Sequence, residues 1–166
     1  MYLDELFYYK NRLMEDLVTN DRIIKLLQDD ADPNKKPEDY IYTQLYPYEY
    51  IPDTNEHGRT FICFDVEVMK ADSKTYYDPV IYVWVFVHKS KMRMPEGGVR
   101  MDEIAIEITN TLSGSRHYGL GELDFFSSRR FAPINDYQGK QLTFHAKDYN
   151  RLHSKSKEIP AKRRDY

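Results

Sequence analysis

The chain has 166 residues, of which 41% are hydrophobic and 31% are charged, so it is long enough for one globular domain with a real core. Its net charge of -3 is too small to indicate a nucleic-acid partner by itself. The single cysteine, Cys63, excludes an intrachain disulfide and a thiolate metal site. No segment approaches the roughly 20 apolar residues that span a bilayer. The N-terminus lacks the basic and apolar regions of a signal peptide, so we expect a protein made and used in a cytoplasm.

Residues 2–28 predict two helices. Apolar residues recur near the helical period over residues 3–17. Thr19, Asn20 and Asp21 then supply N-cap chemistry for a second helix over residues 22–28. The turn-rich stretch 29–34 ends this helical region.

A run of tyrosines follows over residues 40–52 and indicates rigid contact area rather than catalysis. Each ring offers a large amphipathic surface with few rotatable bonds, and Pro47 and Pro52 favour a stiff, extended backbone. Two interpretations fit: a loop that lies over its own sheet, or an arm that docks on a neighbouring subunit. The tyrosines are Tyr40, Tyr42, Tyr46, Tyr48 and Tyr50.

The strongest strand pattern in the chain lies at residues 80–88. Valine and isoleucine line one of its faces, and Tyr82, Trp84 and Phe86 line the other. Because both faces are apolar, this strand is central, or its second face meets a partner.

The remaining elements flank this strand. Residues 61–68 alternate as a half-buried strand, and residues 72–78 form the connection. A helix with one apolar stripe is expected at 100–112. Two more strands, at 123–131 and around 142–146, are joined by a hairpin turn at 135–139.

These elements predict a single α+β domain over residues 1–150. Its antiparallel four-stranded sheet has the order β-β-α-β-β along the chain, with the N-terminal helices and the central helix packed on one face. Residues 60–150 hold the sheet and the central helix. Residues 151–166 have little apolar content and are expected to form a basic, mobile C-terminal tail.

The sequence offers little chemistry, so we expect no catalytic residue, no metal and no cofactor. The histidines lack zinc-hydrolase spacing. Asp53, followed by a strand that carries Asp65 and Glu67, resembles a divalent-metal nuclease, but Lys70 comes one residue late and would point to the opposite face. The simpler interpretation is the polar outer face of an edge strand.

Two basic pairs could touch nucleic acid, but the simpler interpretation is that they are solvated or meet acidic protein surfaces. One such surface is the acidic N-terminal region of a neighbouring copy in a ring. The pairs are Arg129 with Arg130, and Arg163 with Arg164.

A helix pair that ends in Leu26-Leu-Gln-Asp-Asp30 precedes Leu-Tyr-Pro-Tyr-Glu-Tyr-Ile-Pro at 45–52 and then strand–strand–helix–strand–strand. Over roughly residues 3–150 this order resembles the tail terminator (tail completion) and head–tail joining proteins of tailed bacteriophages. The resemblance implies a non-enzymatic virion protein at the head–tail junction, assembled in the bacterial host cytoplasm.

Such proteins form rings, commonly hexamers, that cap the tail tube and dock to the neck. The implied partners are other copies of the chain, the tail tube protein and neck or connector proteins. No membrane and no specific nucleic-acid binding are implied, although DNA can pass through such a ring. A head-closure or connector adaptor is the alternative, and a divalent-metal nuclease is a further one. In a ring, the five tyrosines, the Tyr82–Trp84–Phe86 face and the two basic pairs are the predicted interface residues.

Overall fold

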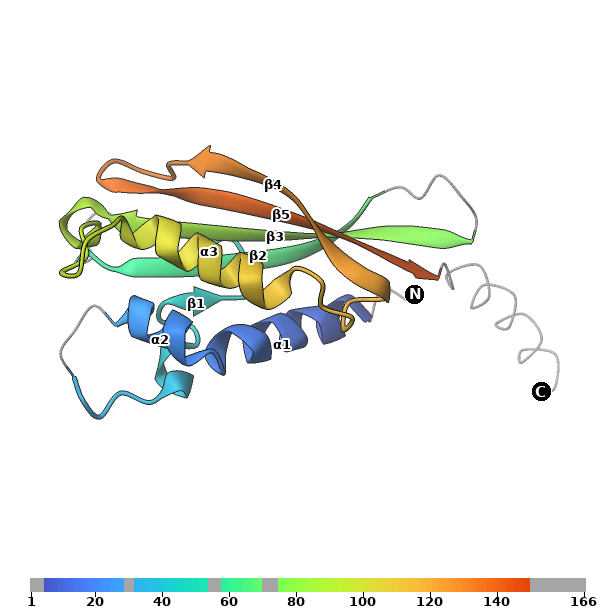
Figure 1. The fold of residues 1–166 in the computed structure, drawn as a ribbon, viewed down its shortest axis with the longest axis horizontal. Coiled ribbons are helices and arrows are strands. Elements are labelled where there is room, and N and C mark those ends of the chain that lie inside the picture. Colours follow the sequence, from blue (N-terminus) through green and yellow to red (C-terminus); the bar gives the residue numbers. More distant parts are fainter. Residues whose placement is uncertain (1–4, 29–31, 54–57, 70–74, 150–166) are drawn as a thin grey trace, which may run out of the picture.

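The computed structural model describes residues 5–28, 32–53, 58–69 and 75–149 (Figure 1). The expected basic tail, with Arg163 and Arg164, lies outside the described residues, as does Lys70.

The expected helices are confirmed. They are α1 (Glu5–Val18), α2 (Asp21–Leu27) and α3 (Arg100–Leu112), with short 3-10 turns η1 (Pro37–Tyr40) and η2 (Lys89–Lys91). Asn20 caps α2, because its side-chain oxygen accepts hydrogen bonds from the backbone N–H groups of Arg22 and Ile23. Its amide nitrogen also donates to Glu107 and Thr111 on α3 at 3.1 and 2.9 Å. One side chain therefore starts α2 and ties it to α3.

The sheet has five strands in the described structure, and the predicted four-stranded antiparallel sheet was incomplete. The strands are β1 (Leu45–Tyr46), β2 (Thr60–Met69), β3 (Tyr76–His88), β4 (Leu120–Phe131) and β5 (Tyr137–Tyr149), and their order across the sheet is β1-β2-β3-β5-β4. β2 to β5 pair antiparallel as expected, but β1 pairs parallel to β2, with Leu45 beside Ile62 and Tyr46 beside Cys63. β1 was not predicted, because two residues are too few to show an alternating pattern.

The strands also extend further than predicted. β3 begins at Tyr76, so Tyr76, Tyr77 and Asp78 belong to the strand rather than to its connection. β4 begins at Leu120, before the strand that was predicted at 123–131, and β5 spans Tyr137–Tyr149 rather than only the residues around 142–146. Strand pairing in these flanks overrides weak local propensity.

The main core lies between the sheet and the helices. Ile62 and Phe64 of β2, Val83 and Val85 of β3, and Phe144 of β5 are each fully buried there against apolar residues of α1, α2 and α3. Figure 1 shows α1 and α3 running alongside the long strands. At about 25 cal/mol per Å² of apolar surface, this burial is the main stabilising term of the fold.

The second face of the sheet carries a smaller, aromatic core. Phe61, Cys63, Trp84, Phe86 and Tyr137 are buried in it. Since its other face lines the main core, β3 is buried on both faces, as expected for a central strand. Part of this second face is covered by the chain's own tyrosine run.

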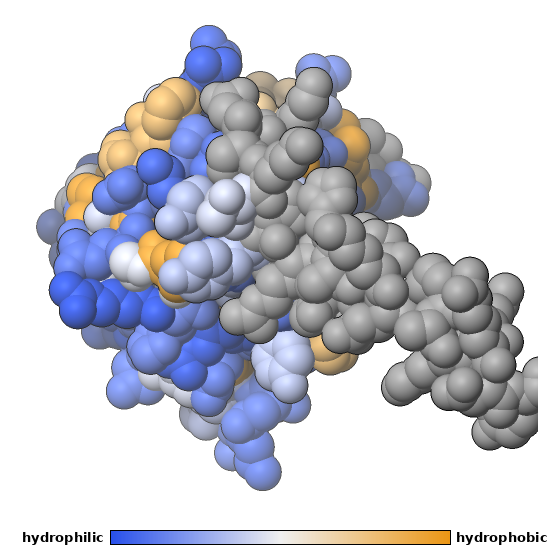
Figure 2. Space-filling model, turned by 90° about the vertical axis from the view of Figure 1, so that its right-hand side faces the viewer, coloured by the Kyte–Doolittle hydropathy of each residue, from blue (hydrophilic) through white to orange (hydrophobic). Residues whose placement is uncertain are grey.

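None of the helices in the described residues is long and apolar enough to cross a bilayer. Figure 2 views the end of the molecule at which α1 and β3 begin and β5 ends. The described surface at this end is mostly hydrophilic, with separate hydrophobic spots.

Candidate protein interface at the tyrosine edge of the sheet

A tight turn over residues 40–45 precedes the rest of the tyrosine run and exposes the ring of Tyr42 to solvent. The N–H groups of Thr43 and Gln44 donate to the carbonyl of Tyr40 at 3.2 and 2.9 Å, and the N–H of Tyr42 donates to the carbonyl of Leu45 at 2.8 Å. To close this turn Tyr42 adopts a φ of 58°, in the left-handed region that costs a bulky residue about 1–2 kcal/mol. The strained residue holds a ring that is 60% exposed.

Two buried residues anchor this turn to the rest of the fold. Tyr40 is 1% exposed within the main core, and the ammonium of Lys35 lies 4.2 Å from the centre of its ring. Gln44 is also buried, and its amide nitrogen donates to the carbonyls of Leu27 and Thr60 at 2.7 and 3.0 Å. The turn is therefore fixed to both α2 and β2.

Four tyrosines contact one another at the β1 edge of the sheet. We call Tyr42, Tyr46, Tyr48 and Tyr50 the tyrosine cluster. The rings of Tyr46 and Tyr50 stack with their centres 4.1 Å apart and an angle of 9° between planes. Tyr48 meets Tyr46 at 5.6 Å and Tyr42 at 6.4 Å. Tyr50 and Tyr46 also contact Phe61 of the aromatic core, at 5.5 and 6.4 Å. The cluster is thus a continuous aromatic surface that starts inside the fold and ends in solvent.

Burial divides the cluster into a base and a rim. Tyr46 is 8% exposed and Tyr50 is half-buried, so these two rings lie over the chain's own sheet. Tyr48 is 45% exposed and the adjacent Ile51 is 53% exposed. The inner layer therefore lies over the chain's own sheet, as the first interpretation of the run expected, and the outer layer is exposed to solvent. Contact with a neighbouring subunit stays a prediction.

Polar contacts hold the second half of the run against α1 and β2. The Lys10 ammonium on α1 lies 2.7 Å from the Asp65 carboxylate and donates to the carbonyl of Pro47 at 3.1 Å. The Cys63 thiol lies 3.8 Å from the carbonyl of Tyr50. Burial raises the pKa of this thiol from 9.0 to about 12, so it is an inert packing group rather than a nucleophile.

The other predicted interface residues lie on separate parts of the molecule. Trp84 and Phe86 are 9% and 0% exposed in the aromatic core, and the half-buried Tyr82 stacks on Trp84 at 5.9 Å. Arg129 and Arg130 are exposed on β4, at the opposite edge of the sheet from β1. The structure therefore brings the tyrosines together and keeps the arginines apart from them.

Two tyrosine–carboxylate hydrogen bonds, one buried and one partly buried, were not foreseen. The Tyr9 hydroxyl donates to Asp148 at 2.5 Å, and the Tyr118 hydroxyl donates to Asp16 at 2.7 Å. Burial, and then the hydrogen bond to Asp16, raise the pKa of Tyr118 above its ordinary value. The partners are 139 and 102 residues apart in sequence, so no local pattern could reveal them. They attach α1 to the end of β5 and to the segment just before β4.

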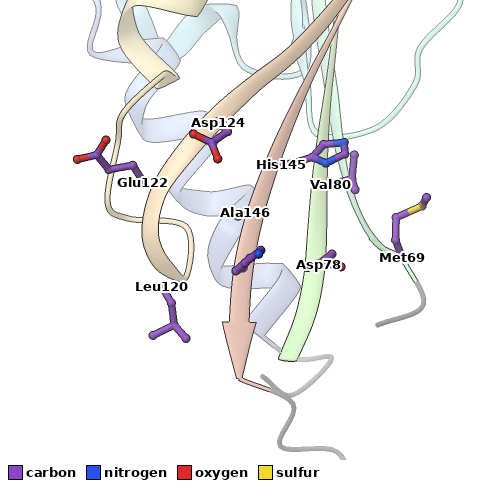
Figure 3. A pocket seen from close by; sticks show the side chains of 9 residues that line it. Met69, Asp78, Val80, Leu120, Glu122, Asp124, His145 and Ala146 are labelled. Carbon is purple, nitrogen blue, oxygen red and sulfur yellow. The ribbon is translucent and has the colours of Figure 1, made fainter. Parts of the chain in front are cut away.

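A hollow of about 540 Å³ opens where β4 curves away from β5 (Figure 3). Asp78, Glu122, Asp124 and His145 are among its lining residues. Figure 3 shows these side chains spread over separate strands rather than meeting at one point.

Within the described residues, no group of three or more His, Cys, Asp and Glu side chains could hold a metal ion. The Asp65 carboxylate, central to the nuclease alternative, is engaged by Lys10.

Comparison with known proteins gives a fold and a family. A chain from the virion of a native gene transfer agent particle is similar to this one with a TM-score of 0.54 and 17% identity, over 84% of this chain and 93% of that chain. At that identity the likeness shows a shared fold. None of the curated proteins matches the chain. The model of the YomW family matches residues 20–146, which is most of the described domain, and the chain therefore belongs to the YomW family.

Proposed function

We propose that this protein is a structural component of a tailed-bacteriophage virion, and that its copies form a ring that terminates the tail tube and joins it to the head or neck. Its action is steric and cohesive rather than catalytic. The ring caps the growing tube, offers a docking face to the neck, and leaves an opening through which DNA passes. Its partners are other copies of the chain, the tail tube protein and neck proteins.

The tyrosine cluster carries this proposal. It is an exposed aromatic surface on a rigid base, since Tyr46 and Tyr50 are packed on the sheet while Tyr42 and Tyr48 project from it. Tyrosine is enriched at the centres of protein interfaces because it gives large contact area at low entropic cost. The strained backbone at Tyr42 favours a role for its exposed ring, because a strained conformation is kept where the surrounding structure and the function require it.

Two further observations support a virion component. The fold is shared with a chain of a gene transfer agent virion, over nearly the full length of that chain. The sequence resemblance to tail terminator and head–tail joining proteins covers the same region. The choice of the head–tail junction rests on that resemblance.

The test is the mass of the purified protein by native mass spectrometry, with negative-stain images of the same sample. The double variant Tyr42→Asn/Tyr48→Ser removes the exposed rings, and asparagine suits the left-handed backbone at position 42. Tyr76→Ser is the matched control, because Tyr76 is 45% exposed, like Tyr48, but lies at the start of β3. We expect the wild type and the control to form rings and the folded double variant to be smaller. Equal masses for all three proteins would refute the role of the cluster.

A head-closure or connector adaptor differs in its partner rather than in this surface. Binding of the purified ring to tail tubes supports the terminator, whereas binding only to the portal-side assembly supports the adaptor. The Asp65 carboxylate that a nuclease would use is paired with Lys10, which supports the structural role that we propose.

A further inference from the structure

β4 is an edge strand whose side chains are ordered by charge along its length. It occupies one end of the sheet order, so one side of its backbone faces away from the sheet. Its first half carries the acidic residues Glu122 and Asp124, its middle carries Phe125 and Phe126, and its second half carries two arginines. The order is acidic, aromatic, basic.

The middle of β4 exposes apolar surface on both faces of the sheet. Phe125 is 42% exposed and meets Phe144 of the main core edge-on at 5.6 Å. Phe126 is 61% exposed and stacks on His145 at 4.3 Å on the other face. Consecutive residues of a strand point to opposite faces of the sheet, so the two phenylalanines cover both sides of this edge. The pairing register then shifts between Phe125 and Ser127.

The charges at the two ends are available for pairing. Arg129, Arg130 and Asp124 are exposed and form no ion pair within the described part of the chain, whereas Glu122 is bonded to Arg116 at 2.8 Å. Asp124 lies on the curved first half of β4 (Figure 3). An edge strand can carry charges merely to prevent association, but that purpose does not require opposite signs at its two ends.

We infer that two copies of this chain pair through β4, antiparallel, about a two-fold axis between Phe126 and Ser127. Antiparallel pairing about this axis places the acidic half of each strand beside the basic half of the other, so Asp124 of one copy lies opposite Arg129 of the second. It also places the exposed phenylalanines of both copies together at the centre. Such a contact is isologous, because each copy contributes the same surface.

This contact goes beyond the proposed ring and does not depend on it. A protein that forms no ring becomes a dimer through β4, and a protein that forms rings joins them in pairs. The tyrosine cluster is on the opposite edge, so the two contacts can be removed separately.

Charge reversal tests the inference sharply. One variant, Asp124→Arg/Glu122→Arg, has a basic β4, and another, Arg129→Glu/Arg130→Glu, has an acidic β4. Each repels itself, so sedimentation equilibrium and native mass spectrometry should give half the wild-type mass. Mixed together, the two variants are complementary along the whole strand, so a mixed species of the wild-type size should form. Glu96→Arg, an exposed charge reversal outside β4, is the control and should keep the wild-type mass.

Circular dichroism melts establish that each variant is folded before its mass is interpreted. High salt should weaken the wild-type contact, because exposed ion pairs are screened. If none of these β4 variants differs in mass from the wild type, the inference is wrong. It is also wrong if the variants lose the contact and do not recover it when they are mixed.

Discussion

Replacing Trp84 with alanine separates folding from assembly. The side chain is 9% exposed, stacks on Tyr82 and meets Phe131 at 6.5 Å. A buried tryptophan removes on the order of 200 Å² from water, which at about 25 cal/mol per Å² gives roughly 5 kcal/mol. Aromatic-to-alanine changes in cores cost about 3–5 kcal/mol, and we expect a loss of that size because Trp84 packs within its own subunit.

The measurement is urea denaturation followed by far-ultraviolet circular dichroism, at a protein concentration where the wild type is monomeric. Tyr82→Ala is the control, and its half-buried ring should cost less, about 1–2 kcal/mol. A loss below about 1 kcal/mol for Trp84→Ala, together with a loss of assembly, would refute the reasoning. Trp84 would then be an interface residue rather than part of the core.

Three further changes test other parts of the account. Gln44→Met leaves two buried carbonyls without their donor, so it should lower the free energy of unfolding by about 2–4 kcal/mol in urea melts, and an unchanged midpoint would contradict the buried network. Gly139→Ala places a Cβ 1.8 Å from the carbonyl oxygen of Val85, so we expect insoluble or unfolded protein, and a native melt would show that the strands can separate. The raised pKa of the Cys63 thiol gives stability that is fully present below pH 9 and is lost as the pH rises to about 12. Between pH 9 and 10 the loss is about 1 kcal/mol, and Cys63→Ala should flatten this slope whatever its effect at pH 7.

The long elements were predictable because each repeats one pattern over several turns or pleats. The helix at 100–112 was predicted with the bounds that α3 has, and the doubly apolar strand at 80–88 does lie at the centre of the sheet. β1 was missed because its two residues gain their partners only from β2. Its pairing is a tertiary event with no local signature.

The sequence predicted which residues form the candidate site, but not which of them are buried and which are exposed. The tyrosine run stood out in sequence, yet nothing there distinguished the buried Tyr40 and Tyr46 from the exposed Tyr42 and Tyr48. That division follows from the left-handed backbone at Tyr42 and from the hydrogen bonds of Gln44, which set the direction of each ring. Similarly, the arginines of β4 were noted as basic residues, but their place on an open sheet edge depends on the strand order.

The central claim is that the exposed rim of the tyrosine cluster joins copies of this chain into a closed ring. The decisive comparison is between the native masses of the wild type and of Tyr42→Asn/Tyr48→Ser, with negative-stain images of both. We expect closed rings for the wild type and their loss in the folded variant. Identical masses and identical images for the two proteins would contradict it.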